Sequence, residues 1–135
     1  MNTMGWGVPW VGLVTLAAIA VYLWAFSRVG AMRGKHKIAA PAMTGHPDFE
    51  RAYRVQANTL EQLVPFLVGL WLAALFLNAL AAAAVGLVWV IARIIYALAY
   101  YRDPAKRGMG FTISAVATVA LLLGALVGLV RHLIG

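Results

Sequence analysis

Residues 62–92 read QLVPFLVGLWLAALFLNALAAAAVGLVWVIA and contain no charged side chain. A bilayer core about 30 Å thick needs roughly 20 apolar residues as a helix, because every backbone amide must find its partner within the segment. The stretch is too long for one span and contains Asn78, a turn-prone residue. We therefore predict two helices joined by a tight turn near residues 77–81.

Two further uncharged segments, residues 6–26 and 109–130, flank this pair. Each is long enough for one span. The first lacks the basic start and small-residue cleavage site of a signal peptide, so we expect it to be retained. The chain is thus predicted to be an all-α integral membrane protein, a four-transmembrane-helix bundle in one domain, 1–135. The predicted spans are approximately 6–27, 58–77, 81–101 and 108–131.

The overall composition supports a membrane protein. Hydrophobic residues make up 64% of the chain and charged residues 11%, which leaves too little polar surface for a soluble domain of this size. The absence of cysteine excludes disulfides, thiolate metal sites and a thiol nucleophile supplied by the protein.

The net charge of +7 comes mainly from two connections that would lie on one face of the membrane. Nine of the eleven Lys and Arg residues belong to them: Arg28, Arg33, Lys35, Lys37, Arg51 and Arg54 in the first, and Arg102, Lys106 and Arg107 in the second. Basic residues collect in cytoplasmic loops, so we predict that loops 1 and 3 are cytoplasmic and both termini outside. With no nucleic-acid motif, we assign the charge to topology and expect no nucleic-acid partner.

The start of the second span has a polar face. Its members are spaced three and four apart and so share one side of a helix: Arg51, Arg54, Asn58, Glu61 and Pro65. Glu61 lies near the membrane boundary, where an ionisable group is costly unless it is paired or solvated by a cavity. Two interpretations stay open, a structural network in which Arg54 or Arg93 neutralises Glu61, and a ligand site.

The third span has a matching face, formed by Arg93, Tyr96 and Tyr100. Arg93 lies about two turns inside the span, so it must pair with Glu61 or with a neighbouring carbonyl. If these two faces met, their arginines would suit the carboxylates of a small anionic molecule, and Glu61 would suit its ammonium group.

The sequence is similar to the membrane-associated proteins in eicosanoid and glutathione metabolism, the MAPEG family. The similarity consists of Glu50-Arg51-x-x-Arg54-x-x-x-Asn58-x-x-Glu61 after Gly45-His46-Pro47, then Arg93-x-x-Tyr96-x-x-x-Tyr100 and Arg107. The resemblance implies a homotrimer of four-helix subunits that binds glutathione as co-substrate between subunits near the cytoplasmic face.

The resemblance also implies roles for individual residues. Arg107 would be the catalytic arginine that lowers the pKa of the glutathione thiol. The glutathione-binding residues would be Arg54, Asn58, Glu61, Tyr96 and Tyr100, with Arg33 and Gln56 reaching the glutathione of the adjacent subunit. Arg51 and Arg93 are candidates for structural ion pairs. Gly34 and Gln62 depart from the leukotriene-forming branch, which disfavours eicosanoid synthesis, and the small loops favour a bacterial inner-membrane protein.

The functional prediction is a glutathione-dependent transferase or peroxidase that acts on lipophilic electrophiles or lipid hydroperoxides. The alternative is a non-catalytic lipid-binding or scaffolding protein of the same fold. A transporter subunit ranks last, because the polar groups cluster at one end instead of lining a path through the midplane. The three histidines, His36, His46 and His132, are scattered along the sequence, so we predict no metal site.

Overall fold

The computed structural model describes residues 4–135 as four long helices and one short 3-10 turn. They are α1 (Met4–His36), α2 (Pro47–Phe76), α3 (Ala79–Arg102), η1 (Pro104–Lys106) and α4 (Gly108–Ile134). All four long helices are apolar and long enough to cross a membrane. The part of the chain that is described contains no strand, and the predicted all-α bundle of a multi-pass membrane protein is confirmed.

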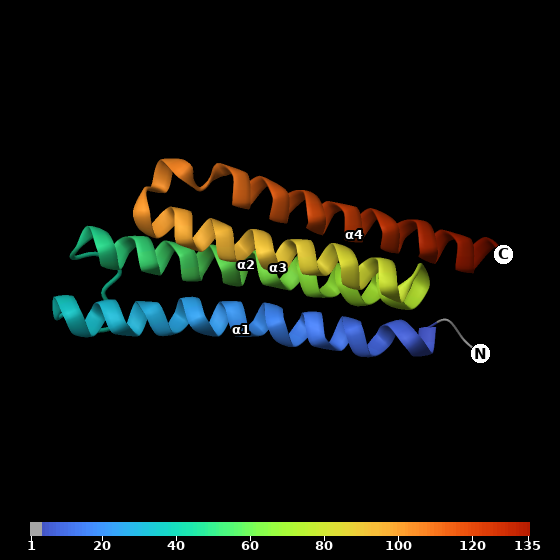
Figure 1. Cartoon of the computed structure of the whole chain (residues 1–135), viewed down its shortest axis with the longest axis horizontal. Helices are drawn as coiled ribbons and strands as arrows, with labels where there is room; N and C mark the ends of the chain where they lie inside the picture. Colours follow the sequence, from blue (N-terminus) through green and yellow to red (C-terminus); the bar gives the residue numbers. More distant parts are fainter. Residues whose placement is uncertain (1–3) are drawn as a thin grey trace.

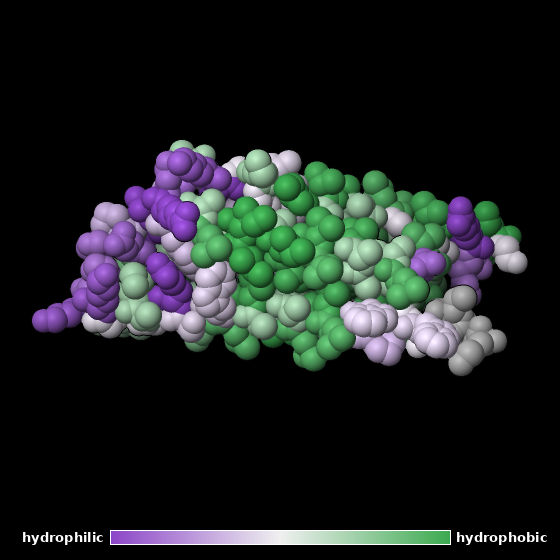
Figure 2. Space-filling view, in the orientation of Figure 1, coloured by the Kyte–Doolittle hydropathy of each residue, from purple (hydrophilic) through white to green (hydrophobic). Residues whose placement is uncertain are grey.

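The helices α2 and α3 form the middle of the bundle. Each of them packs against both α1 and α4, which lie on opposite sides (Figure 1). Both connections between outer and inner helices lie at one end of the molecule, and both termini lie at the other. Hydrophilic side chains gather mainly at the end with the connections, next to a broad apolar belt (Figure 2). This end is called the loop end below.

The helices are longer than the predicted spans. Helix α1 continues to His36, and α2 begins at Pro47, with His46 as its N-cap and acidic residues in its first turn. The break between α2 and α3 falls at Leu77 and Asn78, and the Asn78 side chain accepts a hydrogen bond of 2.9 Å from the Ala81 amide. Where the bilayer boundaries fall along the helices stays a prediction.

A glycine sets how closely α4 approaches α3 at the loop end. A Cβ atom on Gly110 would lie 2.6 Å from the Tyr96 backbone nitrogen and 2.8 Å from the Ala92 carbonyl oxygen, closer than real side chains come. Only glycine therefore permits this contact. The contact fixes the first turn of α4, and with it Arg107, beside the end of α3.

Candidate functional site

A cavity of about 520 Å³ opens at the loop end between α2, α3 and the start of α4. It contains six of the residues predicted for glutathione binding and catalysis, which come from three separate segments. Its lining is Arg54, Ala57, Asn58, Glu61, Tyr96, Tyr100, Ala105, Arg107, Gly108 and Phe111. The two polar helix faces expected from the sequence thus face one common space.

The α2 wall carries the groups of opposite charge. Arg54 and Glu61 are exposed at the cavity, and Asn58 between them is partly buried. Among residues 4–135 the one ion pair joins Arg51 to Asp48 at 4.0 Å, so Glu61 is not neutralised by an arginine. Both a guanidinium and a carboxylate are therefore available to a ligand that carries both signs of charge.

The α3 residue Arg93 lies behind the cavity wall, with no exposed surface. Its Nη2 donates hydrogen bonds of 2.8 Å to Asn58 Oδ1 and to Thr59 Oγ1. Of the two partners predicted for Arg93, Glu61 is wrong, and a neighbouring carbonyl is confirmed in the side-chain carbonyl of Asn58. Thr59 and the inner side of Asn58 face α3, whereas Glu61 projects from the exposed side of α2.

Tyrosines and the start of α4 form the opposite wall. Tyr96 is buried, and its ring centroid lies 5.7 Å from that of Tyr100 and 6.3 Å from that of Phe111. Arg107 is exposed at the cavity, and its Nη1 donates a hydrogen bond of 2.6 Å to the Pro104 carbonyl. Because α4 begins at the next residue, its unpaired amides and positive dipole end lie beside the same guanidinium. This corner of the cavity favours an anion.

Besides Arg93, three predicted residues lie outside the cavity. Arg33 donates hydrogen bonds to the carbonyls of Ala42 (2.8 Å) and Ala39 (3.4 Å) and so holds the α1–α2 connection. Gln56 is half-buried and donates to the Tyr22 hydroxyl on α1 at 3.3 Å. Arg51 pairs with Asp48, as already described. Within one subunit, these side chains serve the packing of helices and loops.

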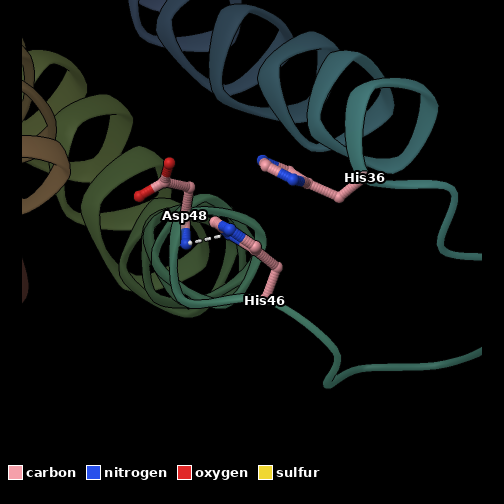
Figure 3. Close-up of side chains that lie close together, drawn as sticks. All are labelled: His36, His46 and Asp48. Carbon is pink, nitrogen blue, oxygen red and sulfur yellow. Dashed lines mark hydrogen bonds between the residues drawn. The ribbon is translucent and has the colours of Figure 1, made fainter.

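His36 and His46, which are separated in the sequence, lie together at the loop end, whereas the prediction of no metal site stays a prediction. Their rings stack with centroids 3.6 Å apart and planes 14° from parallel (Figure 3). With Asp48 they form a group whose potential ligand atoms lie within 4.8 Å of one another. His46 Nδ1 accepts a hydrogen bond of 3.1 Å from the Asp48 amide and so caps the first turn of α2. The stack therefore joins the end of α1 to the cap of α2.

The titration of His36 reflects this setting. Its pKa is lowered from 6.5, first because burial disfavours the charged ring and then because of the neighbouring His46 and Lys35, while Asp48 partly offsets the effect.

The sequence pattern of the MAPEG family matches residues 11–127. The chain belongs to the MAPEG family.

Individual relatives agree with this assignment. An uncharacterized protein of Synechocystis sp. is 44% identical over 124 residues, which cover 92% of this chain and 90% of that protein. Microsomal glutathione S-transferase 2 of Mus musculus is 41% identical over 104 residues, covering 77% and 69% respectively. Leukotriene C4 synthase of Cavia porcellus is 36% identical over 122 residues, covering 89% and 81%.

Two contributions to the site of this MAPEG protein were missed from its sequence. Thr59 and Asn58 both accept hydrogen bonds from Arg93. The position of Thr59 next to Asn58, at the start of a span, could have indicated this role. Phe111 forms part of the apolar lining, and nothing in the uncharged run of α4 distinguished it from residues that face lipid.

Proposed function

We propose that this protein is a glutathione-dependent membrane transferase that adds the glutathione thiolate to lipophilic electrophiles, or reduces lipid hydroperoxides with it. One observation carries the proposal: six residues from α2, α3 and the α3–α4 connection line one cavity at the loop end. Relatives named as a glutathione S-transferase and a leukotriene C4 synthase support the same reaction class.

The charges of the α2 wall match those of glutathione. Glutathione carries two carboxylates and one ammonium group, and the wall offers Arg54 and the Asn58 amide to the former and Glu61 to the latter. A guanidinium can bind a carboxylate through two parallel hydrogen bonds, which would fix the peptide in one orientation. The thiol would then be held toward the opposite wall.

The opposite wall would activate the thiol. Arg107 and the first amides of α4 place positive charge at this corner, and positive charge favours the thiolate over the thiol. In the transfer reaction the thiol proton leaves to solvent, the sulfur forms a bond to the electrophilic carbon, and a leaving group departs with its electron pair. In hydroperoxide reduction the thiolate attacks the terminal peroxide oxygen, the O–O bond breaks, and the alkoxide takes up a proton to leave as the alcohol. The sulfenic acid of glutathione that remains condenses with a second glutathione to give the disulfide and water.

The second substrate would come from the bilayer. Phe111 lines the cavity and is also exposed on the apolar surface of α4. A lipophilic molecule dissolved in the membrane could therefore reach the sulfur without crossing water, whereas glutathione would enter from the polar loop end.

Two features of the assembly belong to the same proposal. We expect a homotrimer, as the family resemblance implies, in which Arg33 and Gln56, which lie outside the cavity of their own subunit, would reach the cavity of a neighbouring one. We also expect the loop end to be cytoplasmic, because nine of the eleven basic residues lie in or beside its two connections. Native mass measurement in mild detergent that found only monomers would contradict the first expectation, and a terminal reporter active in the cytoplasm would contradict the second.

The decisive assay is thiol conjugation by the purified protein. Each protein would be given glutathione with a small aryl halide and, separately, with a lipid hydroperoxide. The proteins to compare are wild type and the variants Tyr100→Phe, Asn58→Ala and Arg131→Gln. We expect turnover in wild type and in Arg131→Gln, whose substitution lies at the far end of α4, and reduced turnover in the two cavity variants. Lipid binding without any consumption of glutathione would instead favour the non-catalytic alternative.

A further inference from the structure

We propose that Arg93 is a positioning residue, which holds the Asn58 side-chain amide so that its N–H groups face the cavity. The proposal rests on the proposed function for its ligand, glutathione. If the proposal is correct, Asn58 binds hydrogen-bond acceptors of the ligand, such as a carboxylate or a carbonyl. Its preference for acceptors is then set by Arg93, which does not itself line the cavity.

The orientation of the Asn58 amide follows from chemistry. Arginine has only hydrogen-bond donors, so the Asn58 atom that meets Arg93 Nη2 at 2.8 Å must be the carbonyl oxygen Oδ1. Asn58 also lines the cavity, and the part of its amide left for the cavity is the NH₂ group. Without Arg93, the amide could turn over and offer its oxygen instead.

Arg93 itself is held firmly enough to impose this choice. It has no exposed surface, and the same Nη2 donates a second hydrogen bond of 2.8 Å to Thr59 Oγ1. The Tyr96 ring covers its guanidinium, with Cζ 4.0 Å from the ring centroid. A rearrangement of Arg93 would therefore disturb α2 and α3 together, and we expect one position only.

The charge of Arg93 should also strengthen the Asn58 donors. No carboxylate forms an ion pair with it in the described part of the chain, and its Nε and Nη1 have no hydrogen-bond partner there. A full positive charge on the carbonyl side of an amide polarises the amide and makes its N–H groups better donors, an effect that is larger in a medium of low dielectric.

The consequence is an ordered row of groups along α2. Arg54 and Asn58 donate, and Glu61 one turn further accepts. Glutathione carries its one ammonium group at the γ-glutamyl end, so this row favours the orientation in which that end lies beside Glu61. Arg93 would thus help to set which end of the peptide lies toward the membrane.

The test is a double-mutant cycle on the Kd of glutathione with Arg93→Gln, Asn58→Ala and the double variant. We expect Arg93→Gln to weaken binding about tenfold, with a much smaller change in kcat, and to have little further effect once Asn58 is alanine. Effects of the two substitutions that simply add would overturn the proposal. The matched control is Arg28→Gln, because Arg28 also stacks on a tyrosine, Tyr101 at 4.4 Å, but lies outside the cavity.

A further variant guards against misfolding. Asn58→Asp keeps an acceptor for Arg93 while removing the NH₂ donors, so it should fold as well as wild type. It should lose at least as much affinity as Asn58→Ala, because its carboxylate would also repel a ligand carboxylate. Unchanged affinity in a folded Asn58→Asp protein would show that the donors are not used, and would overturn the proposal.

A measurement without ligand separates this inference from the proposed function. The side-chain amide protons of Asn58 should give one slowly exchanging pair of NMR signals in wild type and in Arg28→Gln, and shifted, faster exchanging signals in Arg93→Gln. Failure of wild type to bind glutathione would refute the proposed function alone. Identical Asn58 signals in wild type and Arg93→Gln would refute the role of Arg93.

Discussion

Replacement of Arg107 by alanine should raise the pKa of the cavity-bound glutathione thiol by about 1–2 units. Arg107 is exposed at the open side of the cavity, so its field is partly screened. A unit charge about 5 Å from the sulfur contributes roughly 0.8–3.3 kcal/mol for an effective dielectric constant between about 80 and about 20. One pKa unit corresponds to about 1.4 kcal/mol, so this range is roughly 0.6–2.4 pKa units and brackets the stated shift.

The substitution should not raise the thiol pKa all the way to that of free glutathione, because a second source of positive potential remains. Helix α4 begins at Gly108, which also lines the cavity. The positive end of a helix contributes about 0.3–1 kcal/mol to a nearby anion, and the substitution leaves the helix in place. The thiol pKa in the Arg107→Ala variant should therefore stay slightly below that of free glutathione.

The assay is a titration of thiolate absorbance for glutathione bound to wild type, Arg107→Ala and Arg107→Lys. The lysine variant should retain most of the shift, because it keeps the charge. Arg131→Ala is the control, since it removes an arginine from the last turn of the same helix, at the far end of the molecule. Equal thiol pKa values in wild type and Arg107→Ala would refute the reasoning and exclude Arg107 as the activating cation.

Three further outcomes are expected. Gly110→Ala should destabilise the bundle by about 1–3 kcal/mol in thermal unfolding, because its Cβ would press on the Tyr96 backbone, whereas Gly12→Ala, with nothing within 4 Å, should not destabilise it. Glu61→Gln should weaken glutathione binding roughly tenfold or more in calorimetry without lowering the unfolding temperature, because no arginine within residues 4–135 pairs with Glu61. A loss of stability with unchanged binding would contradict this. Folding lowers the pKa of His36, so the unfolded chain binds more protons than the folded chain as the pH falls through about 6.5. Wild type should therefore lose more stability than His36→Phe between about pH 7.5 and about pH 5.5. Equal losses in the two proteins would show that His36 does not contribute.

Much of the site could be predicted because helical periodicity is a local property. Residues three and four apart share a face whatever surrounds the helix, so the grouping of Arg54, Asn58 and Glu61 followed from their positions. Their meeting with Tyr96 and Arg107 was expected from the family resemblance, and the cavity contains all five. The partner of Arg93 could not be predicted in the same way, because Asn58, Thr59 and Glu61 lie within one turn of each other, and only the rotation of α2 about its axis decides which of them faces α3.

Four apolar membrane helices and a turn at Asn78 could be predicted from the amino-acid sequence alone. The reason is that backbone amides in a bilayer must be satisfied within each segment, so length and hydropathy are sufficient. Only the tertiary structure decided which polar side chains meet. The close contact at Gly110, the hydrogen bonds from Arg93 to Asn58 and Thr59, and the stacking of His36 on His46 all join different segments. Such contacts depend on how helices rotate and slide against one another, and this is set by packing across the whole bundle and not by any one stretch of sequence.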